Sequence, residues 1–431
     1  MTLKEHNIRA IAASVLLQNQ KNDKYLQDIL EEELIKFHLS IKDKQLLFHI
    51  VLGLTRNHIL LETILSEFFN LKKTKERLKI ILKIAVYQVI FLDKIPDYAI
   101  TSSMMQTADI FKMKKQQKSF LRAILSKFMK EKDKYSLNND FINSLSLAKK
   151  YSYPDWLIDH FKNEMTSTKL EEVLIAGNSN PPVWIFPVPQ KLEEQELKDI
   201  LDNNKINYLF DDRTKSFTLK NLNKKLKEML NEGDIMIQSP HQKQAISQCP
   251  AIPDDIVLEI GAAPGGKTVH LSKMVGVNGK VFSLDNSAFR IQLLKERIEK
   301  TNLKNVTPLL HDIVTEKNDS ISKTFDHIIL DAPCSNLGEL CRRPEVRWNI
   351  NENDILSLSQ KQKILANTAV SFLKDGGTFL YITCTISTQE NQVIKEYLII
   401  KHNLKLIKDE LILPSKKIPT GSYFALLKKS F

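Results

Sequence analysis

The stretch DDIVLEIGAAPGGKT, residues 254–268, contains the clearest fold signal in the chain. An apolar run typical of a buried strand leads directly into a glycine-dense turn, and sequence of helical length follows. A turn of this kind lets a ligand approach the backbone and the first N–H groups of the helix closely. We therefore expect a parallel α/β sheet whose ligand-binding edge begins at Gly261.

The pattern of strands and helices extends from this stretch in both directions. Three more strand-like runs, GKVFSLD, DHIILDA and GGTFLYITC, follow it with helix-length spacers, which predicts a Rossmann-like, doubly wound domain over residues 234–431. Residues 147–233 combine a short helix start with runs such as NPPVWIFPV, and predict a small α+β domain. Residues 1–135 show apolar positions at helical spacing almost throughout, and predict an all-α domain. The chain is thus expected to be multidomain.

Composition limits the possible partners and compartments. The formal charge of the 431 residues is +11, which suits a polyanion, although only ten of the 62 basic residues are arginine and a general preference for lysine also explains the excess. Four cysteines in so long a chain, without paired CxxC spacing, predict neither a disulfide scaffold nor a metal site and favour the cytoplasm. The N-terminus has no apolar signal core, and no run of eighteen apolar residues predicts a membrane span.

The glycine-rich loop admits more than one ligand. Residues 261–268 formally fit the phosphate-binding pattern GxxxxGK[ST], with Asp331 as a possible magnesium-binding partner, but Pro264 removes an N–H that such a loop needs. Asp285 ends the next strand, where it can hold ribose hydroxyls, and Asp312 can accept from an adenine amino group. These positions favour an adenosyl ligand over a nucleoside triphosphate. A purely structural turn, with both aspartates capping helices, is the third alternative.

Two cysteines end two of the predicted strands. Cys334 follows DHIILDAP, and Cys384 ends GGTFLYITC, so both are expected at the catalytic edge of the sheet. Carbon 5 of cytosine becomes nucleophilic when a thiolate adds to carbon 6, and a second polar group helps to release the product. Asp331, three residues before Cys334, can hold the amino group and ring nitrogen of the base. Cys249 and Cys341 lack such a setting, and we interpret them as structural.

Three arginines lie close together in CRRPEVRW, residues 341–348, although the chain prefers lysine. Guanidinium groups bind phosphate with two hydrogen bonds, so Arg342, Arg343 and Arg347 are predicted to contact the RNA backbone near the target base. A solvated charged loop is the alternative.

The motifs GAAPGGKT, DAPCS and YITCT resemble those of the Sun family of RNA 5-methylcytosine methyltransferases. The resemblance implies that S-adenosylmethionine is the cofactor, that Cys384 is the nucleophile and that Cys334 helps to release the product. It also implies that Gln238 and Ser239 shape the cofactor pocket, and that Asp285, Asp312 and Asp331 line the cofactor and target pocket. The loop residues that the family would place at the cofactor are Gly261, Ala262, Ala263, Pro264, Gly265, Gly266 and Lys267.

The resemblance also covers the rest of the chain. The helical N-terminal domain resembles a NusB-type RNA-binding domain, the α+β domain would be an RNA-binding or linking domain, and the catalytic sheet would have seven mostly parallel strands, the last of them YFALLKK. Its combination of domains resembles the branch of the family that methylates 16S rRNA, which implies a monomer acting on cytosine 967 in bacterial rRNA numbering. Departures from the family pattern are Gly261 in place of a cysteine, Glu259 in place of an aspartate, and Cys341 in place of an arginine.

Several alternatives stay open on the sequence alone. The enzyme could methylate transfer RNA or 23S rRNA, or an exocyclic nitrogen, although the latter class usually has an Asn/Asp-Pro-Pro-Tyr/Phe strand end in place of DAPCS. The chain could also hydrolyse nucleoside triphosphates, or be an inactive RNA-binding protein. The presence of both Cys334 and Cys384 opposes the last two readings.

Overall fold

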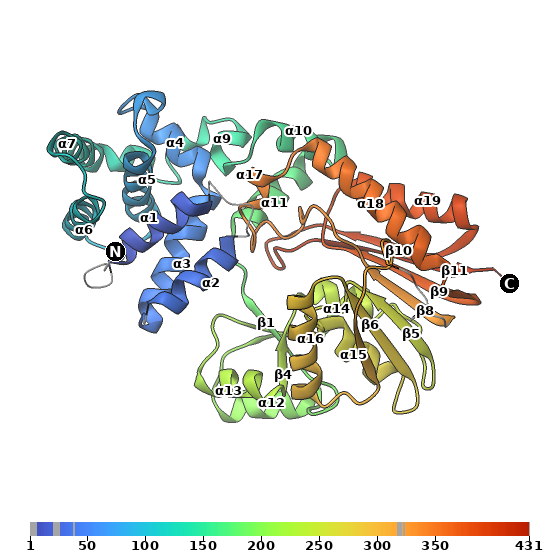
Figure 1. The fold of residues 1–431 in the computed structure, drawn as a ribbon. Coiled ribbons are helices and arrows are strands. Elements are labelled where there is room, and N and C mark those ends of the chain that lie inside the picture. The colour runs from blue at the N-terminus through green and yellow to red at the C-terminus, as the bar shows by residue number, and fades with distance from the viewer. Residues whose placement is uncertain (1–6, 20–25, 38, 317–320, 322–323, 431) are drawn as a thin grey trace. The chain divides into compact units, whose positions relative to one another are not determined.

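The computed structural model describes residues 7–19, 26–37, 39–316, 321 and 324–430 (Figure 1). The chain forms two compact units, Met1–Asn178 with Arg343–Asn349, and Ser179–Arg342 with Ile350–Phe431. Residues 1–6, with which the predicted helical domain begins, lie outside the described residues. Among the described residues, we find no helix with the length and apolar character needed to span a membrane.

The first unit is helical, as predicted. Its elements are α1 (Ile8–Asn19), α2 (Leu26–Lys36), α3 (Ile41–Arg56), α4 (His58–Ser66), η1 (Leu71–Lys73), α5 (Glu76–Phe91), α6 (Asp97–Ile110), α7 (Lys115–Glu131), η2 (Lys132–Tyr135), α8 (Asp140–Asn143), α9 (Leu147–Tyr151), α10 (Asp155–Glu164), α11 (Ser167–Asn178) and α17 (Val346–Asn349). Helix α5 is apolar around most of its circumference and packs against α1, α3, α4, α6 and α7. A helix of this kind must be buried on all sides, so α5 forms the centre of the unit.

The first unit ends later than the sequence predicts. Helices α9, α10 and α11 cover residues that we expected in the α+β domain, but α9 packs on α4, and the Ile59 N–H donates to Ser152 Oγ at 2.7 Å. Three helices with buried apolar faces and no strand between them extend the helical core to Asn178. The predicted change of domain near residue 147 is therefore wrong, because the KYSYPDWLIDHF segment continues the helical unit.

A small antiparallel sheet opens the second unit. Its strands are β1 (Val183–Pro187), β2 (Leu209–Asp211), β3 (Ser216–Leu219) and β4 (Ile235–Ile237), in the order β2-β3-β1-β4. Helices α12 (Glu194–Asn203) and α13 (Lys224–Glu232) bury Leu197, Leu201, Leu226 and Met229 in a common core with Ile185 and Phe217 of the sheet. The α+β character is as predicted, but β4 lies beyond the expected boundary at residue 233.

The second sheet has seven strands in the order β10-β11-β9-β8-β5-β6-β7. They are β5 (Ile256–Ile260), β6 (Lys280–Asp285), β7 (Val306–Leu310), β8 (Phe325–Asp331), β9 (Leu373–Thr383), β10 (Leu404–Ile412) and β11 (Ser422–Lys429). Strand β11 pairs antiparallel with β9 and β10, and the other neighbouring strands pair in parallel. The predicted seven-stranded, mostly parallel sheet is confirmed, and YFALLKK is its last strand along the chain.

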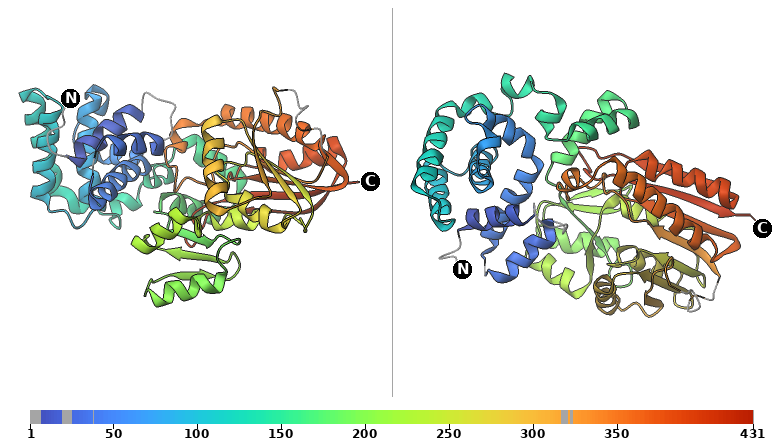
Figure 2. Two further views of the ribbon diagram at one scale, coloured as in Figure 1. Left: turned by 60° about the horizontal axis from the view of Figure 1, so that its bottom comes forward. Right: turned by 45° about the horizontal axis from the view of Figure 1, so that its top comes forward.

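Helices cover both faces of this sheet (Figures 1 and 2). Strand β9 shows the alternation clearly: Phe379 and Tyr381 pack with residues of α18 and α19, whereas Leu380 and Ile382 pack with residues of α14 and α15. Successive side chains of a strand point to opposite faces, so a strand buried on both faces is apolar throughout. The helices are α14 (Pro240–Ile246), α15 (Gly266–Met274), α16 (Ala288–Thr301), α18 (Glu352–Val370) and α19 (Gln392–His402), with η4 (Thr388–Glu390) before α19.

Candidate active site

The two strand-end cysteines meet at one edge of the large sheet. Strands β8 and β9 are parallel neighbours, with Asp331 opposite Ile382, so both chains leave the sheet side by side. The Cys334 and Cys384 Sγ atoms lie 3.2 Å apart, and both side chains are half-buried. The sulfur atoms are thus close enough to act on the same small ligand.

Asn336 completes the immediate surroundings of the thiols. Its Oδ1 accepts a hydrogen bond from Cys384 Sγ at 3.0 Å, and its Nδ2 donates to the Cys334 carbonyl at 3.0 Å. The hydrogen bond with Cys334, together with burial, raises the pKa of the Cys384 thiol well above its ordinary value.

Glu390 joins the loops that carry the two cysteines. Its carboxylate accepts from the Ser335 N–H at 2.8 Å and from Ser335 Oγ, on the Cys334 loop, and from Thr385 Oγ1 at 3.2 Å, next to Cys384. Gln362 Nε2 on α18 donates to the same carboxylate at 3.1 Å. Glu390 is fully buried, and this burial raises its pKa. One carboxylate therefore fixes the positions of both loops.

The glycine-rich loop lies at the end of the neighbouring strand β5. Gly261 has a φ of +76° and Gly265 a φ of +94°, backbone conformations that favour glycine. A Cβ atom on Gly261 would collide with the Asp331 carbonyl oxygen. The glycine that departs from the family pattern thus allows the loop to lie directly against the end of β8.

Lys267 and Glu259 are both bound to neighbours within the unit. The Lys267 ammonium pairs with Asp331 Oδ2; burial lowers the lysine pKa, but the adjacent carboxylate outweighs burial and raises it. Glu259 Oε2 accepts from Thr268 Oγ1 at 2.7 Å and from Ser283 Oγ at 2.9 Å, and burial raises its pKa to about 7. Lys267 therefore orients a candidate catalytic carboxylate, a role that differs from the phosphate contact of a P-loop lysine.

Unsatisfied polar atoms around the loop fit an adenosyl ligand. Asp285 ends β6 and is 4% exposed; its Oδ1 accepts from the Ser287 N–H, and its Oδ2 has no hydrogen-bond partner among the described residues. A buried carboxylate oxygen needs a donor, and a ribose hydroxyl supplies one. Gln238 Nε2 is also buried without such a partner, and lies beside Gly266. The residues present therefore suit S-adenosylmethionine.

Two other predicted residues contribute less directly. Asp312 follows β7, and its Oδ1 accepts from the Val314 N–H at 2.9 Å; this hydrogen bond lowers the Asp312 pKa. The carboxylate is only partly buried, so it can also reach a ligand. Ser239 is the N-cap residue of α14, and its Oγ lies 3.0 Å from Thr420 Oγ1. Ser239 thus holds the segment that carries Gln238.

The three predicted phosphate-binding arginines have different surroundings. Arg342 lies over the Trp184 ring, 5.0 Å from its centroid, and 3.7 Å from Glu339. Arg343 begins the short segment that belongs to the first unit. Arg347 is fully buried there: Nη1 donates to the Arg56 and Ser152 carbonyls and to Asn178 Oδ1, and Nη2 donates to the Gly177 carbonyl. The expected phosphate contact of Arg347 is therefore wrong, because protein acceptors surround its guanidinium.

Sequence reasoning missed three residues of the site, Asn336, Gln362 and Glu390. Asn336 stands two residues after Cys334, and Glu390 six after Cys384, so nearness to the two motifs was the available signal. Gln362 lies in the middle of α18 and had no such signal. Of the predicted residues, the structure brings together Asp331, Cys334, Cys384 and Lys267.

Comparisons with known proteins show which families the parts of the chain match. Residues 250–423 match the family described as 16S rRNA methyltransferase RsmB/F, and residues 6–130 match the NusB family. The chain is 28% identical to ribosomal RNA small subunit methyltransferase B of Proteus mirabilis, over 98% of this chain and 99% of that protein. It is 26% identical to the probable ribosomal RNA small subunit methyltransferase B of Bacillus subtilis, over 93% and 90%.

Solved structures show the same fold. The crystal structure of PH0851 aligns over 100% of both chains with a TM-score of 0.77 and 23% identity. The structure of NSun6 from Pyrococcus horikoshii aligns over 64% of this chain and 98% of its own, with a TM-score of 0.57 and 19% identity. The chain is an S-adenosylmethionine-dependent RNA methyltransferase whose residues 250–423 match the RsmB/F family and whose residues 6–130 match the NusB family.

Proposed function

We propose that this enzyme methylates carbon 5 of a cytosine in 16S rRNA, with Cys384 as the nucleophile. The observation that carries the proposal is the pair of thiols 3.2 Å apart at the ends of β8 and β9, beside Asp331. Methylation of an oxygen or an exocyclic nitrogen has no need of a thiol pair, whereas methylation of carbon 5 needs a nucleophile at carbon 6. The names of the relatives, which act on small-subunit rRNA, support this substrate.

In this proposal the Cys384 thiolate adds to carbon 6 of the base. An S–C6 bond forms, the electrons of the C5–C6 double bond become available at carbon 5, and ring nitrogen N3 takes up the proton that the Cys384 thiol gives up. Asp331 accepts hydrogen bonds from N3–H and the exocyclic amine, while Lys267 holds its Oδ2. S-adenosylmethionine supplies the methyl group that carbon 5 receives.

Cys334 acts after methyl transfer. After its thiol has lost a proton to solvent, Cys334 takes the remaining proton from carbon 5, and the electrons of that C–H bond re-form the C5–C6 double bond. The S–C6 bond breaks with its electron pair on Cys384, which takes back the proton from N3. Asn336, hydrogen-bonded to Cys384 Sγ and to the Cys334 carbonyl, keeps the two thiols on one side of the base. The proposal places the protein in the cytoplasm, where thiols stay reduced, and needs one copy of the chain.

The test uses wild-type protein and the Cys334→Ser variant with tritiated S-adenosylmethionine and protein-free 16S rRNA. We expect labelled 5-methylcytidine at position 967 from the wild type, and a covalent enzyme–RNA adduct from the variant on a denaturing gel. Labelled 5-methylcytidine in transfer RNA or 23S rRNA alone would support the proposed cysteine chemistry but contradict 16S rRNA as the substrate. Label in another nucleoside, or no label on any RNA, would overturn the proposal.

A further inference from the structure

The positive charge of the chain is concentrated around one helix of the first unit. Residues 112–134 contain nine lysines and arginines and two acidic residues, a net charge of +7, whereas the whole chain carries +11. This segment covers α7 and the turns that flank it. Lys118, Lys132 and Lys134 pair with Asp109, Asp97 and Glu67. The charge that still needs an explanation therefore lies on the other six basic residues of the segment.

The packing of α7 fixes which side of it faces solvent. Its buried residues are Leu121, Ile124, Leu125 and Phe128, which contact the helical core. Lys115, Arg122 and Lys130 are exposed, and they follow one another at spacings of seven and eight residues, close to two helical turns. The three side chains therefore form one row about 22 Å long on the solvent side of α7.

The residues between these basic side chains are small. Ser119, Ala123 and Ser126 are all exposed and lie within the same face of α7. Short side chains let a flat or extended ligand approach the helix, and serine hydroxyls can donate to phosphate oxygens. We call the exposed residues Lys115, Ser119, Arg122, Ala123, Ser126 and Lys130 the α7 surface.

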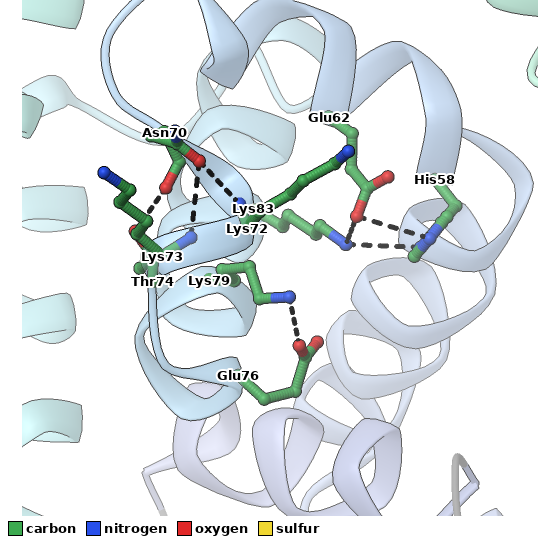
Figure 3. Close-up of polar contacts among 9 residues, drawn as sticks. All are labelled: His58, Glu62, Asn70, Lys72, Lys73, Thr74, Glu76, Lys79 and Lys83. Atoms are coloured by element: carbon green, nitrogen blue, oxygen red, sulfur yellow. Dashed lines mark hydrogen bonds and ion pairs between the residues drawn. The ribbon is translucent and has the colours of Figure 1, made fainter.

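Other lysines of the unit are neutralised within the protein. Lys83 is buried, and its ammonium donates to Glu62 Oε1 at 2.7 Å beside His58, while Lys79 pairs with Glu76 (Figure 3). By contrast, no carboxylate among the described residues forms an ion pair with Lys115, Arg122 or Lys130. Their charge is available to a partner outside the unit.

We propose that the α7 surface binds the phosphate backbone of the RNA substrate. A row of three cations matches several successive phosphates of one strand, and each neutralised phosphate releases counterions. The six residues of the α7 surface include no aromatic side chain that could stack on a base and no amide, although the exposed Gln116 adjoins Lys115. The α7 surface thus supplies affinity without sequence selection. This inference rests on the proposed RNA substrate and adds where the helical unit holds it.

The test compares two triple variants of the full-length chain. Lys115→Ala/Arg122→Ala/Lys130→Ala removes three charges from the α7 surface. Lys36→Ala/Lys162→Ala/Lys169→Ala removes three charges from lysines of the same unit that pair with Glu33, Asp159 and Glu172. Binding to protein-free 16S rRNA and to a 23S rRNA fragment is measured by filter retention at several salt concentrations, with circular dichroism to verify folding.

We expect the α7 variant to bind both RNAs roughly tenfold to thirtyfold more weakly. A plot of the logarithm of the binding constant against the logarithm of the salt concentration should have a slope smaller in magnitude by about two to three. The control variant should stay within about twofold of the wild type. Equal losses in both variants would show that only net charge matters, and unchanged binding of the α7 variant would likewise overturn the proposal. If the α7 variant loses affinity for RNA although the wild type methylates no 16S rRNA, RNA binding by the α7 surface is supported and only the proposed substrate is contradicted.

Discussion

The ends of β8 and β9 and the exposed face of α7 arrange their polar groups in opposite ways. At the strand ends, residues far apart in the sequence converge, and Ser335, Thr385 and Glu390 are buried and bound to one another. On α7, Lys115, Arg122 and Lys130 point into solvent, and no carboxylate among the described residues pairs with them, whereas Lys118 pairs with Asp109. Buried groups depend on each contact and are costly to disturb, whereas exposed charges act additively and are screened by salt.

The largest effect is expected for Cys384→Ser. Serine keeps the size of the side chain but is a far weaker nucleophile, so methylation of 16S rRNA should fall by at least about 10³-fold. Cofactor affinity, measured by calorimetry, should change by less than about twofold, because Cys384 lies beside the candidate base site and not in the glycine-rich loop. Residual activity above a tenth of wild type would assign the nucleophile elsewhere.

Arg347→Met tests the cost of disturbing a buried cation in the helical unit. The variant leaves the Arg56, Ser152 and Gly177 carbonyls without their donor, so we expect the free energy of unfolding of this unit to fall by about 2–4 kcal/mol. Amide hydrogen exchange of residues in α3 and α11 reports that change. Arg342→Met is the control: its guanidinium is partly exposed, and less than about 1 kcal/mol should be lost. Equal losses would remove the distinction between buried and exposed arginines.

Glu390→Gln tests whether one carboxylate positions both thiols. An amide cannot accept from Ser335 and Thr385 with both of its heavy atoms, so the two loops should shift and kcat should fall roughly tenfold to a hundredfold. The KM for RNA and the affinity for cofactor should stay within about twofold, since Glu390 contacts neither in our proposal. Ser359→Ala, which removes a hydroxyl bonded to the Gln389 carbonyl next to Glu390, is the matched control and should keep near-normal kcat. A parallel rise in KM would indicate general disorder of the region.

The sequence predicted the parts of the molecule that depend on periodic patterns. Alternating strand runs and helix-length spacers were enough to predict the large sheet, because strands buried on both faces are apolar throughout. Since parallel strands end at one edge, the same reasoning predicted that Asp331, Cys334 and Cys384 lie close together, and the structure places them so.

The errors fall where tertiary contacts decide. CRRPEVRW looks like an exposed charged loop, but one helical turn, α17, directs Val346 and Arg347 into the helical unit. Composition does not distinguish a buried guanidinium from an exposed one, because long side chains can find acceptors far away in the sequence. Glu390 was missed for the same reason: its partner Ser335 is 55 residues away. Helices α9 to α11 extend the first unit because they continue its packing.

The smallest effect is expected for single substitutions on α7. Arg122→Ala removes one exposed cation, so RNA affinity should fall by only about twofold to threefold, and added salt should reduce this difference. Arg122→Lys should recover most of the loss, because a phosphate contact needs charge more than the shape of a guanidinium. If the three cations contribute independently, the fold losses in RNA affinity of the three single variants should multiply to the fold loss of the triple variant. If a single substitution removes most of the RNA affinity, the residues of α7 depend on one another, as do the buried residues at the strand ends of the catalytic sheet.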